Sequence, residues 1–74
     1  MNARNVADQP ETLSRVMEVI QDAGKPVSIA YVAYNTEISW PTVKAILFRL
    51  CNDGKLSALE TTKGWIFSLK QGRP

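Results

Sequence analysis

The stretch from Ser39 to Asp53 constrains the fold more than any other part of the chain. Its apolar residues recur at the i, i+3, i+4, i+7 spacing that lines one face of a helix, and they are Val43, Ile46, Leu47 and Leu50. Ser39 suits the N-cap position, where its hydroxyl can accept a backbone N–H, and Pro41 is tolerated in the first turn. Gly54 suits the left-handed position beyond a helix end. The stretch therefore predicts one amphipathic helix with a defined start and end.

The outward face of this predicted helix has an unusual composition for a surface in contact with water alone. It contains two aromatic and two cationic side chains, and its members are Trp40, Pro41, Thr42, Lys44, Ala45, Phe48 and Arg49. Cations bind phosphate groups, and apolar side chains contact the methyl group of thymine. We therefore expect the function of the chain to lie on this face.

The length and composition describe one small globular domain. The chain has 74 residues, of which 45% are hydrophobic and 22% charged. Residues 1–8 lack any periodicity, so we expect a flexible N-terminal arm. We assign residues 9–70 to the domain and residues 71–74 to a disordered tail.

Two further helices are predicted before Ser39. Residues 9–23 carry an apolar helical stripe, with Asp8 and Glu11 in the form of a capping box. Residues 29–34 are consecutively apolar and fit either a buried strand or a short helix by periodicity alone. Ser28 as a cap and the alanines favour the helix. Residues 35–38 then form a predicted turn, which completes a helix-turn-helix layout.

After Gly54 the pattern becomes typical of strands. Residues 55–60 and 65–69 are predicted strands, separated by a turn at residues 61–64 that contains a glycine. Trp65 shares one face of the second strand with two other apolar residues, so we expect it to cover the core rather than contact a ligand.

Residues 27–56 resemble the common pattern of winged helix-turn-helix domains, although no single family is identified. The hallmarks are Val32 and Ala33, Ile38, Ser39-x-x-Thr42-Val43, Leu47-x-x-Leu50 and Asp53-Gly54-Lys55-Leu56. The resemblance implies an α+β fold, a small winged helix-turn-helix with three helices plus a C-terminal β-hairpin wing.

In such domains the recognition helix enters the major groove of DNA, and the wing touches the backbone or the minor groove. By position, the residues nearest the bases or phosphates would be Trp40, Pro41, Thr42, Lys44, Ala45 and Phe48, with Lys63 at the wing tip. Ser39 and Thr42 could bind phosphate at the helix N-terminus. Arg49 is the second cation of the helix.

Two aromatic residues of the outward face have structural alternatives. Trp40 could fold back onto the preceding helix, and Phe48 could reach the core or a second copy of the chain. A narrower resemblance is to winged helices that bind Z-form nucleic acids, in which a tryptophan lies near the position of Trp65. Lys44 and Phe48, however, replace the asparagine and tyrosine of those domains.

The charge distribution points to an anionic partner for the second half of the chain. Residues 1–37 contain three cationic and five acidic side chains, whereas residues 38–74 contain six and two, so the net charges are −2 and +4. Such asymmetry between halves is typical of nucleic-acid binding, although in a short chain it can arise by coincidence.

The helix predicted at residues 29–34 is apolar on all sides but needs to bury only one, so Tyr31 and Tyr34 are surplus to the core. Exposed apolar surface of this kind often marks an interface, so we expect these tyrosines at a possible homodimer contact.

Several functions find no support in the sequence. The chain has no histidine, one cysteine and no glycine-rich phosphate loop, so we expect no enzyme activity, metal, cofactor or small-molecule substrate. Cys51 at a helix C-terminus reads as an inert, partly buried thiol. We find neither a membrane-spanning run nor a signal peptide, so we expect a cytoplasmic or nucleoid-associated protein.

The sequence thus predicts sequence-specific binding of double-stranded DNA by a small transcriptional regulator or repressor. The alternative is a winged-helix protein–protein interaction module, used for assembly or docking. Modest charge and surplus aromatic residues favour the alternative, and the lysines of the wing and helix favour DNA.

Overall fold

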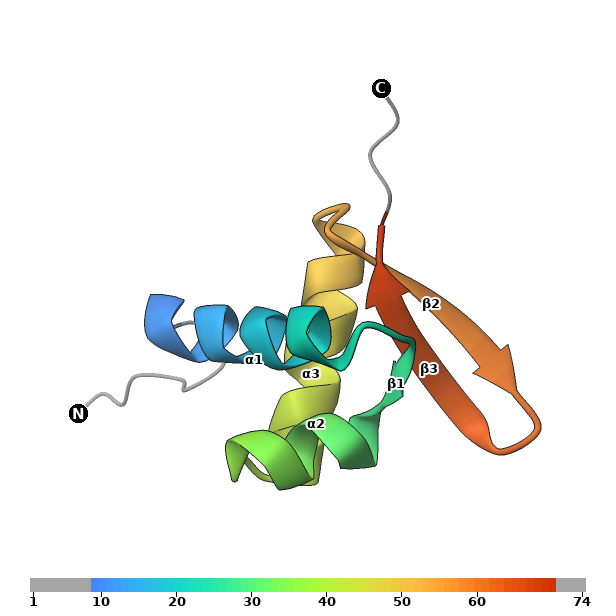
Figure 1. Cartoon of the computed structure of the whole chain (residues 1–74), viewed down its shortest axis with the longest axis horizontal. Helices are drawn as coiled ribbons and strands as arrows, with labels where there is room; N and C mark the ends of the chain where they lie inside the picture. Colours follow the sequence, from blue (N-terminus) through green and yellow to red (C-terminus); the bar gives the residue numbers. More distant parts are fainter. Residues whose placement is uncertain (1–8, 71–74) are drawn as a thin grey trace.

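The computed structural model describes residues 9–70, and it has the predicted α+β architecture (Figure 1). Three helices and a three-stranded antiparallel sheet follow in the order α1 (Pro10–Ala23), β1 (Val27–Ser28), α2 (Ile29–Thr36), α3 (Trp40–Asn52), β2 (Leu56–Thr61) and β3 (Gly64–Leu69). The predicted arm, residues 1–8, and the predicted tail, residues 71–74, lie outside the described residues. The winged-helix-like topology expected from the sequence is therefore confirmed.

The core lies between the three helices and the root of the hairpin. All four residues of the predicted α3 stripe are buried, none more than 3% exposed, and they pack with residues of α1, α2 and the sheet, namely Val16, Ile20, Val27, Ile29, Val32, Leu56 and Phe67. Burying one such aliphatic side chain contributes about 1.5–3 kcal/mol. The inward face of α3 is therefore the centre of the fold.

Helix α1 begins one residue later than a capping box with Asp8 would require. Gln9 is the N-cap and has extended backbone angles, and its side chain makes no capping hydrogen bond. Pro10 disfavours a helical conformation in the residue before it, which explains why the helix starts at the proline. Asp8 of the predicted box lies outside the described residues, and Gln9 takes the N-cap position that the box gave to Asp8. Gly24 ends the helix in the left-handed conformation, as expected.

The ambiguous apolar run is a helix, and it is longer than predicted. The hydroxyl Oγ of Ser28 accepts the N–H of Tyr31 at 3.0 Å, which is the predicted N-cap. At the other end, Asn35 Nδ2 donates to the carbonyl of Tyr31 at 2.8 Å, and Thr36 Oγ1 donates to that of Val32 at 2.7 Å. These bonds extend α2 to Thr36, so the predicted turn at residues 35–38 is wrong in its bounds.

The connection from α2 to α3 is consequently short. Glu37 adopts a left-handed conformation with φ of 61° and donates its N–H to the carbonyl of Ala33 at 2.9 Å. Ile38 follows and packs against the core, as predicted. This tight turn fixes the direction in which α3 leaves α2.

Ser39 is the N-cap residue of α3, but its hydroxyl does not accept a backbone N–H. It donates instead to Thr42 Oγ1 at 2.9 Å, so the predicted cap bond is wrong. A capping hydroxyl can accept the N–H of residue 41 or 42, but Pro41 has no N–H. At Thr42 the side-chain hydroxyl, rather than the backbone N–H, is the partner of Ser39 Oγ. The helix ends as expected, with Gly54 at φ of 81°.

The sheet has the strand order β1-β3-β2. Val27 pairs with Phe67, so residues 27–28 add a short third strand that the sequence analysis did not predict. In the hairpin, Leu56 lies opposite Leu69 and Thr61 lies opposite Gly64, which leaves Thr62 and Lys63 as the turn. The hairpin extends beyond the helices and forms the predicted wing (Figure 1).

Candidate nucleic-acid interface

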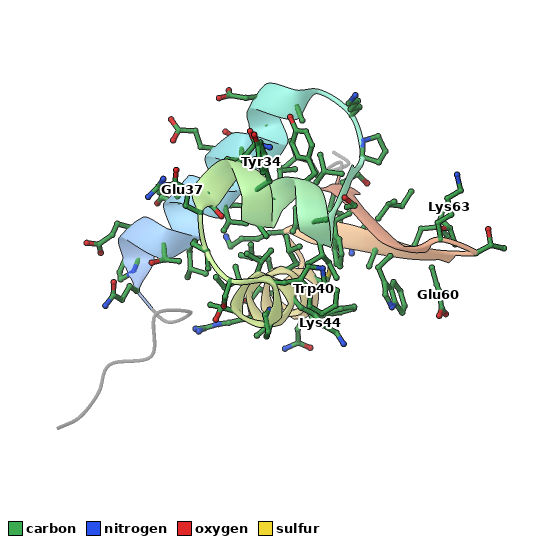
Figure 2. All side chains as sticks on the ribbon, turned by 90° about the horizontal axis from the view of Figure 1, so that it is seen from below. Tyr34, Glu37, Trp40, Lys44, Glu60 and Lys63 are labelled. Carbon is green, nitrogen blue, oxygen red and sulfur yellow. The ribbon has the colours of Figure 1, made fainter. Side chains whose placement is uncertain are left out.

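The outward face of α3 is exposed along its length. Its exposed residues are Trp40, Pro41, Lys44, Ala45 and Arg49, all of them members of the predicted site. Figure 2 shows Trp40 and Lys44 together at the flank of α3 from which the wing extends. The structure thus places five of the nine predicted DNA-binding residues on one continuous helix face.

Trp40 and Lys44 form a defined pair on this face. The Nζ of Lys44 lies 5.7 Å from the centroid of the Trp40 ring, within the range of a cation–π contact. The Trp40 side chain is 48% exposed, and it borders a hollow together with Ile29 and Ala30 at the start of α2. Since the two residues are one helical turn apart, the ring restrains where the ammonium group can go.

Phe48, another member of the predicted site, is buried in part and packs towards the sheet. Its half-buried ring makes edge-to-face contacts with Trp65 and Phe67, with centroid distances of 5.2 Å in both pairs. Phe48 therefore packs against the core, as its structural alternative stated. Helical spacing alone could not settle this, because the contacting rings come from β3.

Ser39 and Thr42 lie at the start of the same face. Ser39 is exposed and Thr42 is half-buried, and the hydrogen bond between them occupies the hydroxyl proton of Ser39. The Thr42 hydroxyl keeps its own proton as a donor. One hydroxyl donor therefore remains at the N-terminus of α3, where two were predicted.

The wing tip contributes a cation and borders a small hollow. Lys63 is exposed in the two-residue turn, whose shape is set by Thr61: its hydroxyl donates to the carbonyl of Gly64 at 2.7 Å and accepts the N–H of Lys63 at 3.1 Å. The hollow, of about 130 Å³, lies between the wing, the start of α2 and α3, and is lined by Ser28, Ile29, Ala30, Trp40, Lys63, Gly64 and Trp65. Wing and helix therefore border one shared concavity.

The wing also carries an acidic residue, Glu60, which was not among the predicted site residues. Glu60 pairs across the hairpin with Trp65, and both lie on the face that includes the buried Phe67. Figure 2 shows Glu60 and Lys63 pointing to opposite sides of the wing. Strand alternation predicts this placement, since residues directly opposite in an antiparallel pair share a face. The wing is therefore cationic on one side and acidic on the other.

Tyr31 and Tyr34 are exposed on α2, as predicted, by 38% and 84% respectively. Figure 2 shows Tyr34 on the side of α2 that faces away from α3. A partner that binds at Tyr34 would therefore leave the outward face of α3 accessible.

Cys51 is half-buried near the end of α3, and burial raises the pKa of its thiol. The thiol is thus held in its neutral, weakly nucleophilic form, as expected. Between residues 9 and 70, the structure contains no group of three or more side chains suited to hold a metal ion. None of the helices in that range is long and apolar enough to cross a membrane.

Comparisons with models of known protein families, with curated proteins and with solved structures found no match for this chain. Geometry and side-chain chemistry are therefore the basis on which a function can be assigned.

Proposed function

We propose that this chain binds double-stranded DNA through the outward face of α3, with the wing beside the groove. It would act as a small sequence-specific transcriptional regulator, most simply a repressor, in the cytoplasm or at the nucleoid. The observation that supports this is an exposed helix face with Lys44 over Trp40, flanked by a projecting hairpin. A helix about 10–12 Å in diameter fits a major groove about 12 Å wide.

The charges of α3 and the hairpin support the same proposal. Their exposed cations include Lys44, Arg49, Lys63 and, directly after β3, Lys70. Each cation that neutralises a phosphate contributes roughly −0.9 to the slope of log affinity against log salt, so all four predict a slope of about −3.6.

The test is a fluorescence-anisotropy titration of a random-sequence duplex at about 50 mM and about 200 mM salt. We expect micromolar binding that weakens steeply between the two conditions. The double variant Lys44→Ala/Lys63→Ala should bind more weakly to every sequence, and its salt slope should be smaller by about 1.8.

A matched control separates the proposed face from net charge. Arg15→Ala/Lys25→Ala removes the same charge from exposed positions on α1 and before β1. This control should keep most of the affinity. Equal losses in the two double variants would contradict the assignment to α3 and the wing, and no binding at low salt would contradict DNA binding altogether.

The B-form duplex fits this face better than a left-handed duplex. The rings of Phe48 and Trp65 are in contact, as a Z-form site built on these two positions would allow. The tyrosine hydroxyl and the asparagine amide of such sites are nevertheless replaced by Phe48 and Lys44. A Z-form polymer added to the same titration should bind no better than the random duplex.

Self-association through α2 is a separate part of the proposal. Tyr31 and Tyr34 offer exposed aromatic surface on α2, with Tyr34 on the side that faces away from α3, and two copies could engage two half-sites. Light scattering should give a dimer mass that falls to the monomer mass for Tyr34→Glu. A monomer mass for the unaltered chain would contradict self-association through α2, and it would not affect the proposal of DNA binding.

Protein docking is the second candidate function, and the exposed apolar side chains favour it. These are Tyr31, Tyr34, Trp40, Leu59 and Leu69. A docking module with this modest charge should leave heparin at low salt, whereas a DNA-binding module should be retained. Early elution together with no duplex binding would favour docking.

A further inference from the structure

Lys44 differs from its neighbours on the outward face of α3 in its capacity to donate hydrogen bonds. Its neighbours on the outward face, Pro41 and Ala45, carry no hydrogen-bonding side chain. The Thr42 hydroxyl lies beside the face, half-buried and bonded to Ser39. Lys44 is therefore the one cation within the first two turns of α3, the part of a recognition helix that contacts base edges.

The Trp40 ring restrains this cation. A free lysine side chain samples many rotamers and can follow any nearby phosphate. Here the ammonium group lies 5.7 Å from the ring centroid, and the ring belongs to the residue one turn earlier. The contact favours rotamers that keep the ammonium group beside the Trp40 ring, at the flank of α3 from which the wing extends. A donor restrained in this way is less free to follow the outer phosphates, and it is therefore better suited to a base edge.

We propose that Lys44 donates hydrogen bonds to O6 and N7 of a guanine in the major groove, and that Trp40 is its positioning residue. This inference rests on the proposed function. Guanine is the base that presents two acceptors there, and lysine pairs with both. Ala45, next to Lys44, is small and apolar and suits the methyl group of a neighbouring thymine. The preferred duplex therefore contains a guanine beside a thymine.

The first experiment selects bound duplexes from a random-sequence pool. The unaltered chain should enrich guanine at one position of the bound sequences. Lys44→Ala should lose that enrichment and Trp40→Ala should weaken it, whereas Trp40→Phe, which retains a ring, should keep it. Lys63→Ala is the matched control, since it removes a wing cation and should lower affinity without changing the preferred base.

The second experiment replaces the enriched guanine by 7-deazaguanine, which lacks N7 and keeps O6. The unaltered chain should lose affinity roughly tenfold, within the range of one bidentate contact. Lys44→Ala should not distinguish the two duplexes. Unchanged melting temperatures of the variants would confirm that the exposed substitutions leave the fold intact.

The outcomes separate this inference from the proposed function. Binding of the pool without guanine enrichment, or full affinity for the 7-deazaguanine duplex, would overturn the role of Lys44 while DNA binding stands. No binding of the pool at low salt would overturn the proposed function itself. If Lys44→Ala binds too weakly for selection, the 7-deazaguanine comparison on the unaltered chain still decides the matter.

Discussion

The two faces of α3 are formed by the same 13 residues and follow different physical rules. On the inward face, Val43, Ile46, Leu47 and Leu50 are buried, and their size and spacing are fixed by packing. On the outward face, Trp40 and Lys44 contact each other, and both side chains are exposed to solvent in part or in full. Packing against the core thus explains the composition of the inward face, and it does not explain that of the exposed outward face.

The largest expected effect comes from the inward face. Leu47→Ala should lower the free energy of unfolding by about 2–5 kcal/mol, because it removes a fully buried side chain and leaves a cavity. Urea unfolding followed by circular dichroism measures this change. Lys44→Ala on the opposite face is the control and should stay within about 0.5 kcal/mol. A loss below that level for Leu47→Ala would contradict the two-face description.

Phe48 lies at the boundary of the two faces and gives an intermediate effect. Phe48→Ala should cost about 2–3 kcal/mol, below the range for a fully buried phenylalanine, because the half-buried ring loses its contacts with Trp65 and Phe67. The same unfolding measurement tests it, with Phe48→Leu as a smaller apolar replacement that should recover part of the loss. If Phe48→Ala leaves the free energy of unfolding unchanged, the ring does not stabilise the core, and Phe48 belongs to the outward face alone.

The smallest effect concerns the charge of the wing. Glu60→Gln should strengthen binding to a random duplex by about twofold at low salt, because it removes an exposed carboxylate from the wing, on the side opposite to Lys63. The gain should vanish at high salt. Glu18→Gln on α1 removes the same charge away from the interface and should leave the affinity unchanged. A weaker affinity for Glu60→Gln would indicate that a cationic protein surface, rather than DNA, meets the wing.

The sequence predicted the inward face of α3 well, because a helix in contact with a core repeats its apolar residues at a fixed spacing. It predicted the ends of elements less well. Gln9 takes the N-cap position of α1 because Pro10 sets the start, and Thr36 extends α2 through a hydrogen bond to its own preceding turn. Both effects depend on local backbone and side-chain geometry, which the spacing of apolar residues does not predict.

The candidate site was predictable only in part. Lys44 and Lys63 could be placed from the helix and the turn alone. The burial of Phe48 depends on the rings of β3, and the relevance of Glu60 depends on the hairpin register that sets it opposite Trp65. These are contacts between elements distant in the sequence, so they became visible only with the fold.

The most direct test of the central claim is a ¹⁵N–¹H nuclear magnetic resonance titration of the full chain with a short duplex. If DNA binds the outward face of α3 and the wing, the largest amide shift changes should fall at Trp40, Lys44, Ala45 and the turn around Lys63. Changes along α1 and at Tyr34 on α2 should be small. Changes confined to α1 or the tyrosines of α2, or no changes at low salt, would contradict the claim.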